Sequence, residues 1–306
     1  MSWKLLPDSV AVDIAARILN TEGTEGTEET NFSGLSSARM ACRAWHGSMM
    51  PQPGCVKRIV LPKVKWQCPL LESDRDFDEF LKWALDIAGE GAESLETGRS
   101  GYRLTNAGLK HLADSRIARS LISLDISDSD ITDTGLELLS SLANLASLKI
   151  DILNPGKTDI GKLRAIPHLV SLSFGCHTII SDRDLPKLPI QLRSLALPEY
   201  EELTEPRITD MGLEMLPRGL TSLDISDIEY VTNEGIRSLP RLLPGLTYLR
   251  LGHCSVGITE DAIASLTALK SLELLDIRDI GFPVFEEAMT ELTGRFKVLY
   301  TEYWTF

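Results

Sequence analysis

One pattern of apolar residues recurs along the chain from residue 120 onward. Each copy has an apolar residue at relative positions one, four and six. The copies read SLISLDIS, NLASLKID, HLVSLSFG, QLRSLALP, GLTSLDIS, GLTYLRLG and ALKSLELL, and the first apolar residues are Leu121, Leu145, Leu169, Leu192, Leu220, Leu246 and Leu269. Turning these positions inward leaves positions three, five and seven facing outward, which predicts seven short parallel strands.

A second pattern alternates with the first. Two aliphatic residues three apart follow a Thr or Ser in phrases such as LTNAGLKHL, ITDTGLELL and VTNEGIRSL. The Thr or Ser can cap a helix, and Pro167, Pro189, Pro217 and Pro240 stand where the chain must leave one. Seven short helices are therefore predicted between the strands, and because no single unit can bury its own core, neighbours must stack into an α/β solenoid.

Both ends of this array carry patterns typical of caps. In residues 51–103, Val56, Ile59 and Leu61 have the spacing of a first strand, and Phe77 and Leu81 belong to one apolar face of a helix. Residues 282–306 contain a second amphipathic segment and an aromatic tail that can cover the last repeat. The repeats themselves are expected at 104–281.

Residues 1–50 have a helical periodicity of their own. A first helix is predicted from Leu6, Val10 and Ile14, and a second from Leu35 and Trp45. Residues 20–31 between them consist largely of Gly, Glu and Thr, which cannot offset the entropy of ordering by burial, so a disordered acidic loop is expected.

The repeats of residues 104–281 resemble the leucine-rich-repeat family. The ITDxGL phrases are closest to its cysteine-containing and GALA-type varieties. The resemblance implies a parallel strand ladder on one side, short helices on the other, and protein binding by the array. The ninth position, which in the family is usually Asn or Cys, varies from copy to copy in this chain, so irregular curvature is expected.

The N-terminal 50 residues resemble an F-box. The Leu6-Pro7 pair, the Ile-rich helix and the Cys42-Arg43-Ala44-Trp45 phrase occur in the order of that family. The resemblance implies a small all-α module that docks a Skp-type adaptor, and through it a cullin, in an SCF-type ubiquitin ligase. The adaptor-binding residues that it implies are Leu6, Pro7, Val10, Ile14, Leu35 and Trp45.

Under this interpretation the chain is a substrate-recognition subunit, with a protein substrate on the repeats. A microbial effector that imitates a host F-box protein is a variant of it. The alternative is an interaction scaffold whose N-terminal helices only cap the array and have no ubiquitin role.

Outward-facing strand residues are the candidates for substrate binding. They are Asp125, Lys149, Asp224, Arg250 and Glu273 at position five and Tyr248 at position three. Aromatic and Arg side chains contribute most to binding at protein interfaces, so Tyr248 and Arg250 are the expected anchors. The alternative is a solvated strand face, because exposed Tyr and Arg residues are common.

Composition narrows the classes of partner. The net charge of −13 argues against nucleic acid and against an anionic membrane, which both require an excess of Lys and Arg. No stretch approaches the roughly 20 apolar residues of a membrane span, and the first residues do not resemble a secretory signal. The five cysteines form no CxxC pair, which suits a reducing compartment, the cytoplasm or the nucleus.

An enzyme is the least favoured class. His253 and Cys254 are adjacent, but neighbours on an extended segment point apart, and Cys254 falls at the ninth repeat position. Cys176 and His177 have the same arrangement. His46, Cys55 and Cys68 lack the spacing of a zinc site. We expect no catalytic residues, no metal and no cofactor.

Overall fold

A computed structural model describes residues 58–60, 77–79, 81–82, 85, 91–97, 103–127, 129–151, 159–176, 178–198, 208–252, 258–278 and 292–299. The chain divides into two compact units, residues 1–145 (unit 1) and 146–306 (unit 2). The predicted all-α module and its loop, with all six predicted adaptor-binding residues, lie outside the described residues, as do Val56 and Leu61.

The described residues of unit 1 include three parallel strands. They are β1 (Arg58–Val60), β2 (Ser94–Glu96) and β3 (Ser123–Ile126). The helical elements are α4 (Asn106–Asp114), η2 (Arg116–Arg119) and α5 (Asp133–Leu139), together with helical residues at 77–79 and 81–82. Ile59, Leu95 and Leu124 pair in register, and each is almost fully buried.

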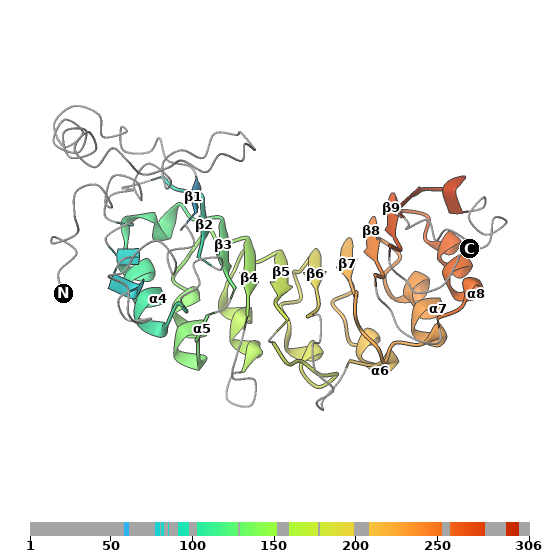
Figure 1. The fold of residues 1–306 in the computed structure, drawn as a ribbon, viewed down its shortest axis with the longest axis horizontal. Coiled ribbons are helices and arrows are strands. Elements are labelled where there is room, and N and C mark those ends of the chain that lie inside the picture. Colours follow the sequence, from blue (N-terminus) through green and yellow to red (C-terminus); the bar gives the residue numbers. More distant parts are fainter. Residues whose placement is uncertain are drawn as a thin grey trace, which may run out of the picture. The chain divides into compact units, whose positions relative to one another are not determined.

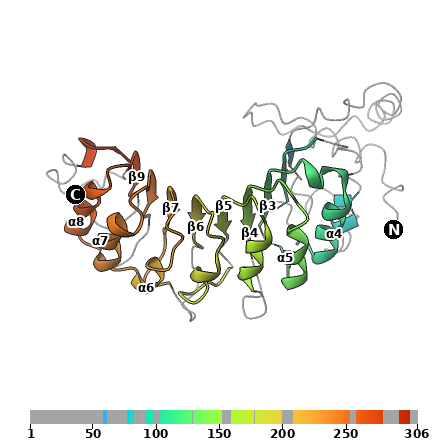
Figure 2. The ribbon, with the colours of Figure 1, turned by 180° about the vertical axis from the view of Figure 1, so that it is seen from behind.

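In unit 2, the part of the chain that the structure describes forms seven strands, each parallel to the next (Figure 1). They are β4 (Ser147–Ile150), β5 (Ser171–Phe174), β6 (Ser194–Ala196), β7 (Ser222–Asp224), β8 (Tyr248–Arg250), β9 (Leu274–Asp276) and β10 (Lys297–Leu299). Its helical segments are η4 (Ile160–Ala165), η5 (Leu185–Lys187), α6 (Asp210–Leu213), α7 (Asn233–Leu242), α8 (Glu260–Ala264) and η6 (Ser265–Ala268). They lie on the other side of the strand ladder (Figure 2).

The core of unit 2 is a ladder of aliphatic side chains. The position-four leucines pair strand to strand and are at most 1% exposed: Leu148, Leu172, Leu195, Leu223, Leu249 and Leu275. Positions one and six are buried in the same way in the coils of β4 to β9. Each unit is therefore a stretch of leucine-rich-repeat solenoid, and the predicted α/β class is confirmed.

The register predicted for the last repeat is wrong. Leu274 pairs with Tyr248 and Asp276 with Arg250, so position five of this coil is Asp276 and not Glu273. The phrase LELLDI, three residues further along, has the same apolar spacing as the predicted copy. Leu269 and Leu272 are both buried, so the apolar pattern satisfied two registers and only strand pairing distinguishes them.

Strand β2 was missed by the repeat pattern because its unit has Ala92 at position one and Thr97 at position six. Both are buried, and the Thr97 hydroxyl donates to the carbonyl of Asp125 at 3.2 Å. Strand β10 lies in the predicted C-terminal cap and adds one more parallel partner to β9.

The helices differ from the prediction in two respects. Segments η4 and η5 are 3₁₀ rather than α, and Pro186 stands in the first turn of η5, where no amide donor is needed. Pro240 does not end its helix, because α7 continues to Leu242. Leu239 and Leu242 are both buried, so packing holds this turn in place despite the missing amide.

Successive coils are joined by a clamp between side chain and backbone. The capping Thr232 of α7 donates its amide to Oδ1 of Asp210 at 2.8 Å and its hydroxyl to Oδ2 at 2.6 Å. Asp210 is the first residue of the preceding helix, α6. The same pair of bonds joins Thr209 to Asp182 and Thr105 to Asp78, and single-acceptor versions join Thr132 to Asn106 and Thr259 to Asn233.

The glycine of the repeat phrase makes room for this clamp. A Cβ at Gly235 would lie 2.2 Å from Oδ1 of Asp210, and one at Gly212 equally close to Oδ1 of Asp182. The glycine is therefore required by close approach to the neighbouring coil. This explains why Thr, Asp or Asn, and Gly recur together in the ITDxGL phrases.

The coil of η5 departs from this arrangement. Asp184 occupies the position that glycine holds in most other coils, and a side chain there would fill the space of the clamp. The amide and hydroxyl of Ser181 both donate to Oδ2 of Asp184, within the same coil, at 3.1 and 2.9 Å. One substitution thus accompanies a change from inter-coil to intra-coil bonding.

Candidate functional site

The outward-facing strand side chains of unit 2 form two rows. Position three reads Ser147, Ser171, Ser194, Ser222, Tyr248, Leu274 and Lys297, and position five reads Lys149, Ser173, Ala196, Asp224, Arg250 and Asp276. We call these two rows the strand face. Four of the predicted substrate-binding residues, Lys149, Asp224, Tyr248 and Arg250, lie on it.

Two predicted residues lie elsewhere. Asp125 is at position five of β3 in unit 1, where it stands opposite Glu96 of β2 in the strand register. Glu273 is exposed and precedes β9, outside both rows. Asp276 takes its place at position five and Leu274 stands at position three, and both were missed because the last repeat was aligned in the wrong register.

The strand face has two distinct parts. From β4 to β7 it presents partly exposed serines at position three, which form a low polar floor. At β8 and β9 the side chains become large, with Tyr248 beside Leu274 and Arg250 beside Asp276. The position-three row is therefore small from β4 to β7 and bulky at β8 and β9.

Arg250 lies between two carboxylates. Its Nη1 is 3.2 Å from Oδ2 of Asp224, and its Nε is 3.7 Å from Oδ2 of Asp276. Oδ1 of Asp224 accepts the amide and the hydroxyl of Ser226 at 3.0 and 2.7 Å. The guanidinium is therefore held in place before any partner binds.

Asp276 is the buried member of this network. Its side chain is 1% exposed, and it accepts bonds from Nε and Nη2 of Arg278 at 2.9 and 2.6 Å. These hydrogen bonds, with the positive charges of Arg278 and Arg250, outweigh its desolvation and hold its pKa below the usual value. The carboxylate stays ionised, and its two guanidinium partners compensate for its burial.

The same charges act on Tyr248 and Arg250. Desolvation raises the pKa of the Tyr248 phenol, and the nearby carboxylates of Asp276 and Asp224 raise it further, so the hydroxyl keeps its proton at neutral pH. Partial burial alone would lower the pKa of Arg250, but its attraction to Asp224 and the hydrogen bond between them outweigh burial and raise it. Tyr248 can therefore donate as well as accept a hydrogen bond.

The pKa of Asp276 predicts a dependence of stability on acid. The pKa of Asp276 in the folded chain lies below the ordinary 3.8. Its contribution to the unfolding free energy is therefore complete above that value and is lost as pH falls toward the folded pKa. The difference in unfolding free energy between wild type and Asp276→Asn should therefore shrink over roughly pH 5 to 3, measured by urea titration. A constant difference would contradict the assignment. Desolvation raises the pKa of Asp78, so this residue changes the unfolding free energy with pH in the opposite direction. Comparing wild type with Asp276→Asn isolates the contribution of Asp276.

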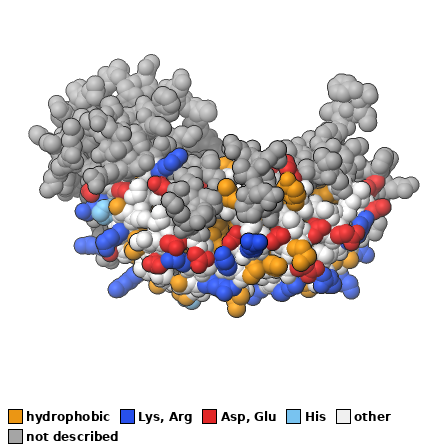
Figure 3. Space-filling view, turned by 90° about the horizontal axis from the view of Figure 1, so that it is seen from below, with side chains coloured by type: hydrophobic (Ala, Val, Ile, Leu, Met, Phe, Trp, Pro, Cys, Tyr) orange, Lys and Arg blue, Asp and Glu red, His pale blue; other side chains and the backbone are white. Residues whose placement is uncertain are grey.

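The face that carries the helical segments has a mixed surface (Figure 3). Acidic, basic and apolar side chains alternate on it. Its charged side chains form exposed networks of their own, in which Glu214 pairs with Arg218 and Arg241, and Lys187 with Asp159 and Asp184. Outside the strands of unit 2, Ile190, Met211 and Met215 are 79%, 64% and 40% exposed.

The structure describes only one of the four Cys and His residues in the two adjacent pairs that the sequence singled out. His253, Cys254 and His177 lie outside the described residues, and Cys176 is partly exposed and forms no disulfide. Among the residues that the structure describes, no group of three His, Cys, Asp or Glu side chains is arranged to hold a metal ion. Within the same residues no helix has the length and apolar character needed to cross a bilayer.

Among comparisons with known proteins, only those with solved structures found a similarity to this chain. No family model matches the chain, and no curated protein does. The chain is similar to an internalin (InlF) from Listeria monocytogenes, with 18% identity over 72% of this chain and 65% of the internalin and a TM-score of 0.41. It thus spans less than two thirds of that protein. It is also similar to a structure of the Rad7 and Elc1 complex of yeast, with 19% identity over 80% of this chain and 67% of the other and a TM-score of 0.47.

Proposed function

We propose that this chain is a non-catalytic protein-recognition subunit that binds a protein partner on the strand face of unit 2. The observation that carries the proposal is the pair Tyr248 and Arg250 on β8, held by Asp224 and Asp276. Tyr and Arg contribute disproportionately to protein interfaces, and a side chain that is already ordered loses little entropy on binding.

The shape of the strand face favours a polypeptide ligand. Strands about 4.8 Å apart make the serine floor from β4 to β7 about 15 Å long, and β8 and β9 extend it beyond that. Small side chains let a partner's backbone approach closely, and Tyr248 offers both a ring and a hydroxyl at one end. An extended segment or one helix fits these dimensions.

We further propose that the partner is the substrate of an SCF-type ubiquitin ligase. The support is the order of the sequence, with the F-box-like residues 1–50 preceding the repeats. Leu6, Pro7, Val10, Ile14, Leu35 and Trp45 would contact a Skp-type adaptor and through it a cullin. The repeats, of the cysteine-containing or GALA-type variety, would then raise the effective concentration of the substrate near the conjugating enzyme in the cytoplasm or nucleus.

The alternative is a scaffold that uses the same strand face without a ubiquitin role. It is favoured if the N-terminal helices cap the array instead of presenting an apolar docking surface. A microbial protein that engages a host Skp-type adaptor is a variant of the first proposal and makes the same biochemical prediction.

Two linked binding measurements test this proposal. In the first, purified chain is titrated with purified Skp-type adaptor by calorimetry, and the Leu6→Ala/Pro7→Ala variant should bind about tenfold more weakly or not at all. Tyr248→Ala should bind the adaptor as wild type does, because it lies on the repeats. Absence of binding by the folded wild type, or binding unaffected by the double variant, would remove the ubiquitin proposal and leave the scaffold.

The second measurement addresses the strand face itself. Partners captured from a eukaryotic lysate by the wild-type chain are compared with those captured by Tyr248→Ala and by Tyr230→Ala. Tyr230 is the matched control, since it is an exposed tyrosine (47%) that lies on no strand. Partners lost with Tyr248→Ala and kept with Tyr230→Ala support the strand face, whereas equal capture by all three chains rules it out as the binding surface.

A further inference from the structure

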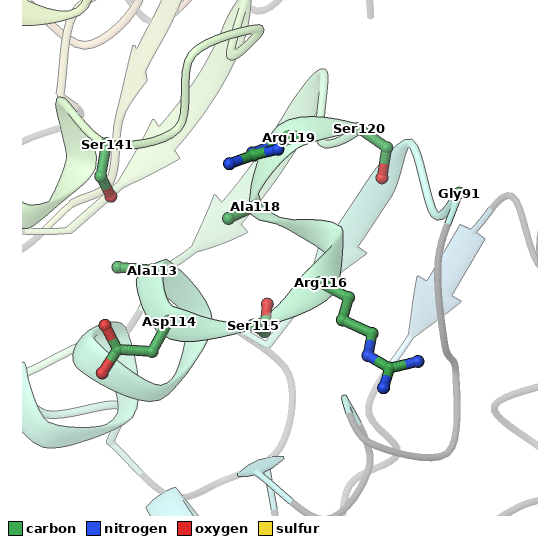
Figure 4. Close-up of a pocket in the computed structure, with 9 residues that line it drawn as sticks. All are labelled: Gly91, Ala113, Asp114, Ser115, Arg116, Ala118, Arg119, Ser120 and Ser141. Carbon is green, nitrogen blue, oxygen red and sulfur yellow. The ribbon is translucent and has the colours of Figure 1, made fainter.

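A depression in unit 1 is lined by polar side chains most of which are already engaged within the chain. It has a volume of about 830 Å³ and lies at the end of α4 and along η2 (Figure 4). Asp114 in its lining is paired with Lys110, and the hydroxyls of Ser115, Ser120 and Ser141 donate to backbone carbonyls. These lining hydroxyls therefore have no proton left to donate to a ligand.

The strand face of unit 2 has a donor that the chain itself does not use. Within the part of the chain that the structure describes, the hydroxyl of Tyr248 forms no hydrogen bond, and its side chain is partly exposed on β8. The raised pKa of this phenol keeps it protonated at neutral pH. A partner bound here can accept a hydrogen bond from Tyr248 or donate one to it.

Tyr248 also belongs to an apolar pair that spans two strands. In the strand register it stands opposite Leu274 on β9, and on its other side it stands opposite Ser222 on β7. Neighbouring strands are about 4.8 Å apart, so the side chains of Tyr248 and Leu274 lie next to each other on one face. The core of the β9 coil is filled by Leu275 and Ile277, whereas Leu274 faces outward and is partly exposed. The pair is therefore an apolar surface that a partner can cover.

The charged side chains beside this pair compensate one another. Arg250 contacts Asp224 and Asp276, and Arg278 donates two hydrogen bonds to Asp276. Two guanidinium groups thus meet two carboxylates, and their charges cancel. Lys297 on β10, two strands away from β8, lies outside this group. A partner with a charged anchor would have to disrupt these ion pairs and desolvate its own charge, whereas an uncharged anchor leaves them intact.

An uncharged apolar anchor fits this part of the strand face. The ring of Tyr248 and the side chain of Leu274 provide apolar contact, and the phenol hydroxyl can bond to a peptide group. We infer that the strand face binds its protein partner through one aliphatic or aromatic side chain packed against Tyr248 and Leu274, while the Tyr248 hydroxyl bonds to the backbone of the partner. This inference rests on the strand face being the binding surface proposed above.

The test selects random short peptides, displayed on phage, for binding to the immobilised full chain, with counter-selection on Tyr248→Ala. Peptides that require Tyr248 should share one aliphatic or aromatic residue, and replacing it by Ala should weaken binding at least about tenfold in fluorescence anisotropy titrations. Their affinity should change less than about twofold when salt is raised from about 50 to about 300 mM, because no new ion pair is formed. A shared acidic or basic residue that binding requires, or a strong loss of affinity in salt, overturns the inference.

Variants of the chain separate the apolar contact from the hydrogen bond. Leu274→Ala should weaken the selected peptides severalfold, and Tyr248→Phe, which keeps the ring and removes the hydroxyl, should weaken them by about two- to tenfold. Ile190→Ala and Tyr230→Ala are the matched controls, because they remove exposed side chains of the same kinds outside the strands and should have little effect. Equal losses in Leu274→Ala and Ile190→Ala overturn the inference.

The failure of this inference is distinguishable from the failure of the proposed function. If no selected peptide depends on Tyr248, the strand face is not the binding surface, and the inference falls with it. If the peptides depend on Tyr248 but bind through a charged anchor, the strand face stands and only the inference is overturned. Neither outcome bears on adaptor binding.

Discussion

Replacing Gly235 by alanine is expected to lower the unfolding free energy by about 2–3 kcal/mol, although alanine is the better helix former. The added Cβ would lie 2.2 Å from Oδ1 of Asp210, the atom that accepts the amide of Thr232 at 2.8 Å. The carboxylate must move away, and two hydrogen bonds between successive coils are lost with it. Urea denaturation followed by circular dichroism measures the effect.

A double-mutant cycle distinguishes this cause from a general intolerance of side chains. Asp210→Ala alone should be destabilising, but Gly235→Ala added to it should be nearly neutral, because the Cβ then meets no carboxylate. Gly245→Ala is the control, since a Cβ there has nothing within 4 Å, and it should change stability little. Additive effects of Gly235→Ala and Asp210→Ala would show that the clamp does not explain the glycine.

Replacing Leu223 by alanine is expected to cost about 2–5 kcal/mol, the range for large-to-small changes in a packed core. Leu223 is fully buried at position four of β7, where it pairs with Leu195 and Leu249 in the neighbouring strands. Truncation leaves a cavity between three coils, which cannot collapse without shifting the strand ladder. Thermal and urea unfolding of the purified variant measure the loss.

The adjacent residue provides the control for Leu223. Ser222 is at position three of the same strand and faces outward, so Ser222→Ala should change the unfolding free energy by less than about 0.5 kcal/mol. Because each coil contacts only its neighbours, the loss in Leu223→Ala should also appear in the amide exchange of β6 and β8 before it reaches distant coils. Similar effects of the two substitutions would mean that the strand is not packed as described.

The clamp gives a physical meaning to the repeat phrase. Thr supplies two donors, Asp or Asn supplies the acceptor for the next coil, and Gly leaves space between them, as in Thr232, Asp210 and Gly235. Where Asp184 replaces the glycine, the hydroxyl of Ser181 turns to its own coil. The stacking of coils is thus specified by polar residues as well as by the leucines.

Much of the fold follows from the sequence alone. The apolar spacing at positions one, four and six predicts buried strands, because a pleated strand alternates its faces and an isolated unit cannot bury its own core. That argument placed Leu124, Leu148 and Leu223 in the core and Tyr248 and Arg250 on the outside, as the structure has them. The sequence pattern predicts these positions correctly because the inward or outward direction of a strand side chain depends on residues only a few positions apart.

Only the tertiary structure decided the strand register and the side-chain contacts that involve neighbouring coils. The register of β9 was ambiguous, because Leu269 and Leu272 fit two overlapping patterns, and only pairing with β8 put Asp276 beside Arg250. The contacts of Asp210 with Thr232 and of Asp276 with Arg250 could not be read from spacing, because each joins residues of two neighbouring coils. Sequence periodicity therefore determined which side chains are buried. Strand pairing between coils decided which of the outward-facing side chains meet, because it depends on hydrogen bonds that periodicity does not encode.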